Sequence, residues 1–217
     1  MDTISTLGSL MGLGLVSGIR LYSTVLVVGL GIRLGLLHPS QPLAGLAVLA
    51  STPILIIAGV AYVIEFLADK IPFVDTAWDV LHTFIRPVGA AVLAATALGP
   101  IDPALKVGAI LLAGSIAFSG HSAKAGTRAL INQSPEPFTN IGASLAEDGL
   151  VAGGTWLALS HPMVALVVVL VVVGLVIWLV PKIVRLVRRE LEHLRRFFTG
   201  KALEPETGEG SGVPAGH

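Results

Sequence analysis

Long apolar stretches separated by short polar turns dominate the first 181 residues of the chain. An α-helix rises about 1.5 Å per residue and needs about 20 apolar residues to cross a hydrocarbon core of about 30 Å. The pattern therefore predicts an all-α, polytopic helical membrane protein with about six membrane helices, one or two of them broken or re-entrant. The expected helices cover residues 3–37, 43–71, from 75 or 76 to the turn at 99–103, 104–130, 140–159 and 163–180.

The first apolar stretch, residues 3–37, is too long for one simple crossing. As a single helix it would measure roughly 50 Å, so it must tilt, break or re-enter. Gly12, Gly14 and Gly18 precede Arg20 and favour a break or a close helix contact. Two interpretations follow: a glycine-rich packing face with an arginine that snorkels to the interface, or a discontinuous helix that lines a site.

The hairpin between the second and third expected helices is the most highly charged part of the membrane region. Residues 65–90 contain six formal charges and one histidine, whereas 34–64 and 87–101 contain no Asp, Glu, Lys or Arg. Glu65 and Asp69 are four residues apart and therefore share a helix face. A tight connection makes the two helices antiparallel neighbours, so this pair is expected to face the next helix.

A polar stripe runs along that next helix. Asp75, Asp79, His82 and Arg86 follow the spacing i, i+4, i+7 and i+11, which places them on one face. Asp75 or Thr76 is expected to cap the start of this helix. A guanidinium near the membrane boundary stays charged and needs acceptors, so we expect carboxylates from both hairpin helices to hold Arg86.

The later helices carry further ionisable groups. The polar segment Ser119-Gly120-His121-Ser122 is expected to break its helix, and Lys124 and Arg128 follow on one face. Glu147 and Asp148 lie inside an apolar helix and need a polar partner, for which Lys124 and Arg128 are the candidates. The pairs Ser17-Gly18 and Ser119-Gly120 hold similar places in their helices, which suggests an inverted internal repeat.

Composition supports a membrane protein and excludes several other classes. Hydrophobic residues make up 53% and charged residues 13% of the chain, with a mean hydropathy of +0.84. Cysteine is absent, which excludes disulfides and thiolate chemistry. The basic excess in 182–201 is a topology signal and not a sign of nucleic-acid binding, and it places both termini in the cytoplasm of a multi-pass inner-membrane protein. Three parts are expected: a helical membrane domain at 1–181, a basic amphipathic juxtamembrane helix at 182–201 and a disordered tail at 202–217.

Two kinds of ligand site are compatible with the polar residues. Asp75, Asp79 and His82, with Glu65 and Asp69 opposite, have spacing suited to a divalent metal, although nothing in the sequence requires one. The same residues also describe an ion-pair network with Lys70 and Arg86. An anion is the other candidate ligand, since basic side chains lie in or beside the polar breaks: Arg20, Arg86, Lys124 and Arg128.

Fragments of one enzyme signature are present. Ser119-Gly120-His121 and Arg86-Pro87 resemble parts of the signature of the phosphatidic acid phosphatase family. Asp79 stands where that family has a lysine, and the Ser-Arg segment with its spaced His and Asp is missing. Sequence signatures of nucleotide-driven pumps and of familiar membrane proteases are absent.

Longer motifs point to one family. The segments EFLADKIPFVDTAWDVLHTFIRPVGA, SGHSAKAGTRALIN and SPEPFTN, with the later Glu147-Asp148 pair, resemble the small bacterial membrane proteins of domain of unknown function 4126. The resemblance covers about residues 7–180. It implies a compact helical membrane protein, and it implies no particular activity.

The sequence thus favours a small membrane transporter or channel, not driven by ATP, for an ion or small anionic solute. A membrane enzyme acting on a phosphorylated lipid and a structural membrane protein without transport activity are the alternatives. Expected partners are the bilayer, the ion or solute and, through glycine-rich helix faces, a second copy of the chain. The candidate binding residues are Arg20, Glu65, Asp69, Asp75, Asp79, His82, Arg86, His121, Lys124, Arg128 and Asp148.

Overall fold

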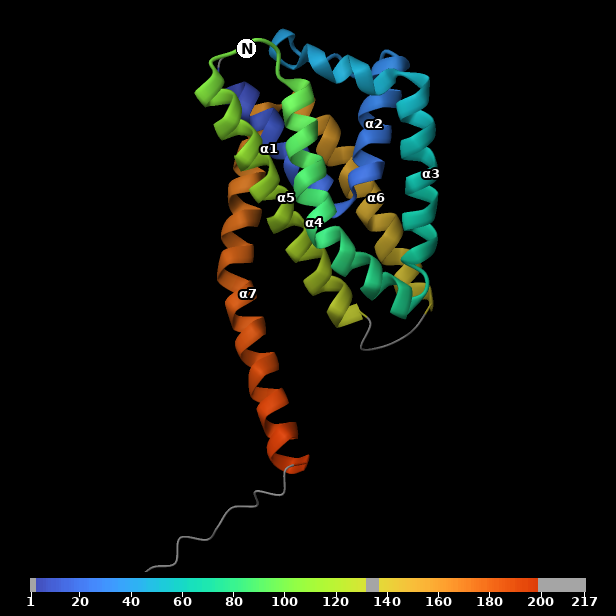
Figure 1. Ribbon diagram of the computed structural model, residues 1–217, viewed down its shortest axis with the longest axis vertical. Helices are drawn as coiled ribbons and strands as arrows, with labels where there is room; N and C mark the ends of the chain where they lie inside the picture. The colour runs from blue at the N-terminus through green and yellow to red at the C-terminus, as the bar shows by residue number, and fades with distance from the viewer. Residues whose placement is uncertain (1–2, 132–136, 199–217) are drawn as a thin grey trace, which may run out of the picture. The chain divides into compact units, whose positions relative to one another are not determined.

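The regular structure of the described residues is entirely helical (Figure 1). The computed structural model describes residues 3–131 and 137–198, with side chains assigned except at 72, 73, 75, 76, 129, 130, 137, 180, 183, 184 and 186–198. The expected loop at 132–136 and the expected tail at 202–217 lie outside the described residues. The elements are α1 (Thr3–Ile19), α2 (Leu21–Arg33), the 3-10 helix η1 (Gln41–Ala50), α3 (Thr52–Ala68), α4 (Pro72–Ala97), α5 (Pro103–Ile131), α6 (Pro137–Ser160) and α7 (Pro162–Phe198).

The first apolar stretch is a broken helix, and Arg20 is the residue at the break. Arg20 adopts an extended conformation with φ −148° and ψ 98° between α1 and α2. Its N–H still bonds the Val16 carbonyl at 2.9 Å, so the backbone remains satisfied at the break. The Arg20 side chain is 0% exposed. The snorkelling interpretation is therefore wrong, and the discontinuous helix is confirmed.

The α1–α2 segment turns back and does not cross the bundle (Figure 1). Thr3, at the start of α1, and Pro42, which follows α2, line the same cavity of about 220 Å³. Near the start of α1, Gly8 packs against the Pro162 carbonyl at the start of α7. Trp178 lies about 24 Å further along α7, at 1.5 Å per residue. The start of α1 and Trp178 thus lie at opposite ends of this unit, and the cytoplasmic placement of both termini stays a prediction.

The second apolar stretch is also divided, so the single helix expected at 43–71 is wrong. The 3-10 helix η1 and α3 meet at a bend of 72°. Pro53 lies in the first turn of α3, where a residue without an N–H is tolerated, whereas inside a helix it would remove a hydrogen bond. Proline is likewise tolerated in the first turn of the next helix, which begins at Pro72 after Ile71. The predicted start at Asp75 or Thr76 is therefore wrong.

The two Ser-Gly pairs mark the place where α1 and α5 cross. A Cβ on Gly18 would collide with the Ala117 carbonyl, and a Cβ on Gly120 would lie 2.5 Å from the Leu15 carbonyl oxygen. Glycine lets the two backbones approach this closely. The α5 helix runs unbroken from Pro103 to Ile131, so the expected break at 119–122 is wrong. Close packing explains the two Ser-Gly pairs without requiring an internal repeat. Gly18 packs against α5 of its own chain.

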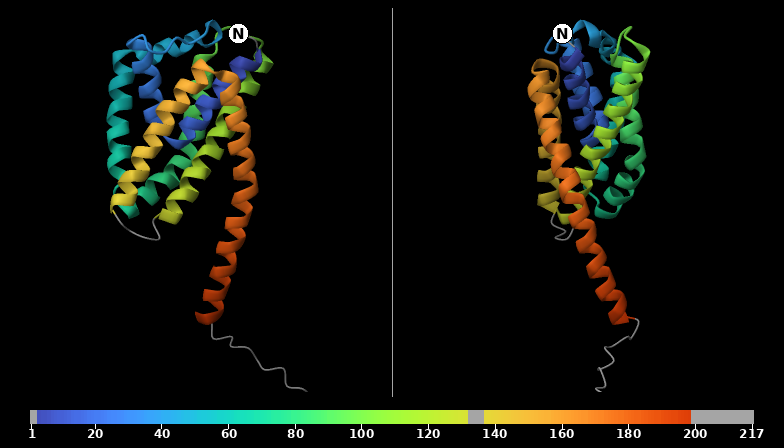
Figure 2. Two further views of the ribbon diagram at one scale, coloured as in Figure 1. Left: turned by 180° about the vertical axis from the view of Figure 1, so that it is seen from behind. Right: turned by 90° about the vertical axis from the view of Figure 1, so that its left-hand side faces the viewer.

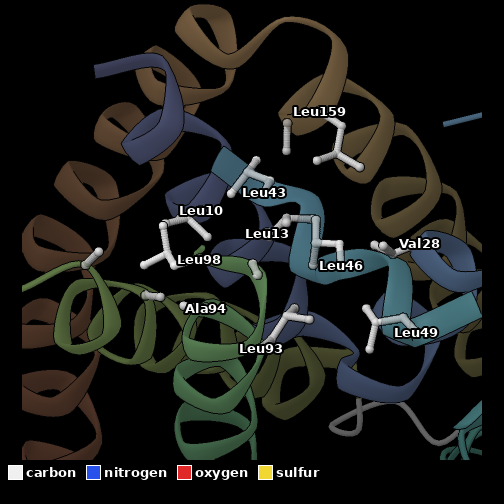
Figure 3. Packing of buried hydrophobic residues seen from close by; sticks show 14 of the residues in the cluster. Leu10, Leu13, Val28, Leu43, Leu46, Leu49, Leu93, Ala94, Leu98 and Leu159 are labelled. Atoms are coloured by element: carbon white, nitrogen blue, oxygen red, sulfur yellow. The ribbon is translucent and has the colours of Figure 1, made fainter. Parts of the chain in front are cut away.

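One apolar core lies at the end of the bundle where η1 packs across the helices (Figure 3), and a second, formed by Leu15, Ile116 and Val169, joins α1, α5 and α7. Elsewhere the outer faces are apolar and the interior is charged, the reverse of a water-soluble protein. Exposed residues on α3, α4 and α5 include Ile57, Val60, Phe84, Val88, Leu111 and Phe118. The core at the η1 end includes Leu10, Leu13, Val28, Leu43, Leu46, Leu49, Leu93 and Leu98.

Three helical segments in the described part of the chain are long and apolar enough to cross a membrane: Ala77–Ala97, Pro103–Arg128 and Pro162–Leu179. The bent pair of η1 and α3 raises the number to four if it counts as one span. The expected count of about six is not confirmed. The helix α7 continues to Phe198, which confirms the helical extension expected beyond Lys182.

Candidate functional site

Nine ionisable side chains from four helices, α3 to α6, and the α1–α2 break gather inside the bundle. We call this group the ion cluster. All nine are connected by ion pairs of 4.0 Å or less. The members are Arg20, Glu65, Asp69, Asp79, Arg86, Lys124, Arg128, Glu147 and Asp148.

Arg20 enters the cluster from the tip of the α1–α2 hairpin. Its Nη2 donates a hydrogen bond to Asp69 Oδ2, at the end of α3. Its Nε lies 3.1 Å from Glu147 Oε2, and its Nη1 lies 3.3 Å from Asp148 Oδ1, both on α6. The break in the first helix thus places the Arg20 guanidinium beside three carboxylates.

Lys124 and Arg128 reach the same carboxylates from α5. Arg128 Nε donates to Glu147 Oε1 at 2.8 Å, and its Nη2 donates to Glu147 Oε2 at 3.1 Å, a bidentate arrangement. Lys124 Nζ lies 3.4 Å from Glu147 Oε2, 3.6 Å from Asp69 Oδ1 and 4.0 Å from Glu65 Oε1. The predicted pairing of Glu147 with Lys124 and Arg128 is confirmed.

Two uncharged residues of α6 complete the environment of Arg128. Its Nη2 donates to Ser144 Oγ at 3.0 Å, and its Nη1 lies 3.4 Å from Asn140 Oδ1. The sequence reading missed both residues. Asn140, Ser144 and Glu147 follow i, i+4 and i+7 spacing, so the helical pattern around Glu147 could have found them.

Arg86 forms a second centre with three partners. Its Nη2 donates to Glu65 Oε1 of α3 at 2.8 Å, and its Nη1 lies 3.3 Å from Asp79 Oδ1 of its own helix. The prediction that carboxylates from both hairpin helices hold Arg86 is confirmed. The third partner is His121 Nδ1 of α5, at 2.6 Å from Arg86 Nη1. Arg86 therefore links three helices.

The hydrogen bonds around His121 determine its tautomer. Thr83 Oγ1 donates to the Asp79 carbonyl at 3.0 Å, so it accepts from His121 Nε2, also at 3.0 Å. The other nitrogen, Nδ1, then accepts from Arg86. His121 is thus a neutral imidazole with its proton on Nε2. A second proton on the ring would face the Arg86 guanidinium directly.

His82 lies beside this centre but takes no part in the ion pairs. Its Nδ1 donates to the Trp78 carbonyl at 2.8 Å, which leaves Nε2 to accept from Tyr22 Oη at 3.3 Å. The ring stacks on Trp78 with centroids 4.6 Å apart. This is a satisfied and packed histidine.

Asp148 lies at the less buried edge of the cluster. Its Oδ2 accepts from Tyr62 of α3 at 2.8 Å, and its side chain is 20% exposed. Ser23 Oγ lies 3.4 Å from Asp148 Oδ1. Tyr62 was not among the predicted residues, although it precedes Glu65 by three positions and so lies near the same helix face.

The cluster contains more carboxylates than cations. Five carboxylates face four cations. At Arg86 one guanidinium contacts both Glu65 and Asp79, and Glu65 has a further, more distant cation in Lys124, at 4.0 Å. Among the described side chains, several buried charged atoms also lack a hydrogen-bond partner. They are Arg20 Nη1, Glu65 Oε2, Asp69 Oδ1, Asp79 Oδ1, Arg86 Nε and Lys124 Nζ. Four of these atoms, Arg20 Nη1, Asp69 Oδ1, Asp79 Oδ1 and Lys124 Nζ, nevertheless lie within 4.0 Å of an oppositely charged atom.

Comparison with known protein families identifies the family of this chain. Residues 7–182 match the family described as Domain of unknown function (DUF4126). The chain belongs to this family. No curated protein and no solved structure matched it. The ion cluster of this DUF4126 protein lies within the matched residues, and its α3–α4 part is formed by the longest of the recognised motifs.

The remaining predicted contacts of the DUF4126 protein have mixed outcomes. The side chain of Asp75 lies outside the described residues. Within the described residues, no group of three or more His, Asp or Glu side chains could hold a metal ion, because guanidinium and ammonium groups stand between the carboxylates. Lys70 does not join the network as expected: its Nζ lies 3.4 Å from the centroid of the Phe66 ring and has no hydrogen-bond partner. Hence the ion-pair interpretation fits better than the metal interpretation.

Proposed function

We propose that this protein is a small ion-coupled membrane transporter or channel, in which the ion cluster binds a proton or a monovalent cation. The observation that carries the proposal is the unequal charge around Arg86, where Glu65 and Asp79 share one guanidinium. A buried carboxylate without a counter-charge is costly in a membrane interior, and a bound proton or cation removes that cost.

The same count argues against an anionic solute. The four cations already face five carboxylates at 4.0 Å or less, so an added anion would increase the uncompensated negative charge. Attraction between buried charges must exceed their loss of hydration before binding is favourable. A proton or cation meets this condition at the Arg86 centre, and an anion does not.

The α1–α2 hairpin supports a transport role in a second way. Transporters often place their binding site where helices are discontinuous, because the break frees polar groups inside the membrane. Here Arg20 occupies the break and contacts Asp69, Glu147 and Asp148. A movement of the hairpin would change the charge balance of the whole cluster.

Asp79→Asn tests the proposal because it removes the surplus charge with little change of shape. Arg86 retains Glu65 at 2.8 Å, so the variant should fold and keep its thermal stability. We expect it to abolish potential-driven uptake of H⁺ or Na⁺ into proteoliposomes, read with a pH-sensitive or sodium-sensitive dye inside the vesicles.

Asp102→Asn is the matched control for that experiment. Asp102 is exposed and caps α5 through the backbone N–H groups of Ala104 and Leu105, at 2.9 and 3.1 Å. Asparagine caps a helix about as well as aspartate, so this variant should keep both fold and flux. Flux by folded Asp79→Asn protein at the wild-type rate, or no wild-type flux above that of empty vesicles, would overturn the proposal.

An enzyme acting on a phosphorylated lipid is the second candidate, and the contact of Arg86 with His121 favours it. These residues belong to the two sequence fragments that resemble a phosphatase signature, and their side chains lie 2.6 Å apart. Against this role, Glu65 and Asp79 already occupy the guanidinium. Phosphate release from phosphatidic acid by the purified protein, lost on His121→Asn, would support the enzyme over the transporter.

The membrane arrangement that fits the proposal has five crossings and one re-entrant hairpin. The crossings are the η1–α3 pair, α4, α5, α6 and the first part of α7, with α1–α2 as the hairpin. The basic residues of 182–201 favour the cytoplasmic side of a bacterial inner membrane. The start of α1 then faces the opposite side. Association of copies through the open glycine Gly142 of α6 is a further proposal.

A further inference from the structure

A cavity of about 650 Å³ lies beside the ion cluster, between α1, α5, α6 and the first part of α7. Its size is in the ordinary range for small-molecule sites, about 300 to 1,000 Å³. The walls are apolar, with Leu15, Leu157 and Val172 among the lining residues, and Lys124 and Glu147 are the charged residues that line it. Viewed from behind, α6 and α7 diverge from their connection on this side of the bundle (Figure 2).

The rim of the cavity is apolar and accessible. Leu150 of α6 is 62% exposed and Val168 of α7 is 40% exposed, and both line the cavity. The α7 segment Pro162–Leu179 is apolar enough to cross a membrane. A cavity with such a rim can exchange hydrocarbon chains with the bilayer, whereas water gains little from entering apolar walls.

Lys124 supplies a polar side chain in the wall of the cavity. Its side chain is 1% exposed, and Nζ has no hydrogen-bond partner although three carboxylates lie within 4.0 Å. An ammonium group carries three donors and no acceptor. Lys124 Nζ therefore has donors left for an oxygen of a bound molecule that accepts a hydrogen bond.

The local charge decides what kind of head group can supply that oxygen. Around Lys124, the three cations Arg20, Lys124 and Arg128 face Asp69, Glu147 and Asp148. Glu65, which is paired with Arg86, also lies 4.0 Å from Lys124 Nζ. This part of the cluster is already balanced, so a phosphate or carboxylate head group would bury an uncompensated charge. A neutral hydroxyl, ester or ketone oxygen accepts from Lys124 without adding charge.

We propose that this cavity binds a neutral, single-chain membrane amphiphile, with its hydrocarbon chain along the apolar walls and an uncharged oxygen of its head group at Lys124 Nζ. The inference goes beyond ion transport and does not depend on it. A lipid at this position contacts Lys124, which also contacts Glu65 of the Arg86 centre at 4.0 Å. Occupancy of the cavity can therefore affect the ion cluster directly.

A photoreactive monoacylglycerol, with a diazirine in its acyl chain, tests this in phosphatidylcholine nanodiscs. We expect saturable labelling that maps to residues 143–157 and 168–172, which line the cavity. Unlabelled monoolein should compete for this labelling, and 1-oleoyl lysophosphatidic acid, which has the same chain and an anionic head, should compete roughly tenfold less well. Equal or stronger competition by the anionic lipid would overturn the neutral head group. Labelling spread evenly over all lipid-facing helices would overturn the site.

Glycines in the cavity wall allow it to be filled without a clash. A Cβ at Gly153 or at Gly149 meets no atom within 4 Å, and both residues line the cavity. Gly153→Leu should lower saturable labelling by roughly tenfold or more, because the new side chain occupies the space of the acyl chain. Gly108→Leu is the matched control, since Gly108 also has open space but lies outside the cavity.

Two further variants keep the test decisive. If Gly153→Leu does not fold, Gly149→Leu fills the same space and replaces it. Lys124→Met should lower saturable labelling by the photoreactive monoacylglycerol, because the hydrogen-bond donor is lost. It should not improve competition by lysophosphatidic acid, because loss of a cation leaves the site more negative. Equal labelling of the filled variants and Gly108→Leu would overturn the proposal, as would undiminished labelling of folded Lys124→Met protein.

Discussion

The Arg86 guanidinium donates a hydrogen bond to Glu65 Oε1 at 2.8 Å, with both side chains 0% exposed. This contact joins α4 to α3 inside a bundle whose outer faces are apolar. It defines the role of the charged hairpin. The charged residues of the hairpin do not all lie in a water-facing turn, because two of them form an ion pair within the bundle.

Arg86→Ala is expected to destabilise the protein strongly. The substitution leaves Glu65 without its guanidinium partner, and loss of one member of a buried ion pair costs about 3 to 5 kcal/mol. Unfolding in sodium dodecyl sulfate, followed by circular dichroism, measures the difference. Arg33→Ala is the control: Arg33 is exposed and its Nη1 lies 3.1 Å from Thr52 Oγ1, so it should change stability by no more than about 0.5 kcal/mol. Similar unfolding midpoints for the two variants would contradict a buried network.

Single cysteines test the re-entrant hairpin, and the chain contains no native cysteine that would interfere. With 182–201 in the cytoplasm, Thr3→Cys and Ser160→Cys should react with an impermeant maleimide on intact cells, and Arg185→Cys should react only after permeabilisation. The reason is that α1 starts near Pro162, at the opposite end from Trp178. Labelling of Thr3→Cys and Arg185→Cys from the same side would show that the first segment crosses.

The sequence predicted which residues are charged partners better than it predicted how the helices are broken. Helical spacing placed Asp79 and Arg86 on one face, and charge alone required partners for Glu147. Both expectations are confirmed by ion pairs. Such predictions succeed because a buried charge has few alternatives to pairing.

The paths of the helices could not be predicted in the same way. Apolar residues are equally suited to a crossing helix and to a helix that turns back. The sequence of residues 3–37 therefore does not predict which of the two paths the chain takes. The break at Arg20 depends on Asp69 and Glu147, which are distant in sequence and reach it only in the fold. At 119–122 the error was the reverse, because a glycine needed for close packing against Leu15 resembled a helix breaker.

His121→Leu should weaken the protein through the Arg86 centre. The neutral His121 ring accepts from Arg86 at 2.6 Å, and an apolar replacement leaves that buried N–H without this acceptor. An unsatisfied buried group costs about 1 to 3 kcal/mol, and more if charged. Melting of the purified protein should therefore shift downward for His121→Leu, and much less for His121→Asn, whose amide oxygen can accept. As control, His161→Leu affects an exposed ring in edge contact with Trp156 and should have little effect. Equal melting of His121→Leu and wild type would exclude this contact as a source of stability.

Gly18→Ala tests whether the close crossing of α1 and α5 positions the break that carries Arg20. The added methyl group would overlap the Ala117 backbone carbonyl, so one helix must shift, and overpacking of this kind costs about 1 to 3 kcal/mol. At Gly108 of the same helix pair, a Cβ meets no atom within 4 Å. Gly108→Ala should therefore be neutral or stabilising by up to about 1 kcal/mol, as expected for glycine replaced by alanine within a helix. Unfolding midpoints in sodium dodecyl sulfate separate the two variants. Equal stability of Gly18→Ala and Gly108→Ala would show that α1 and α5 are packed less closely than described. The close crossing would then not explain why Arg20 lies between Asp69 and Glu147.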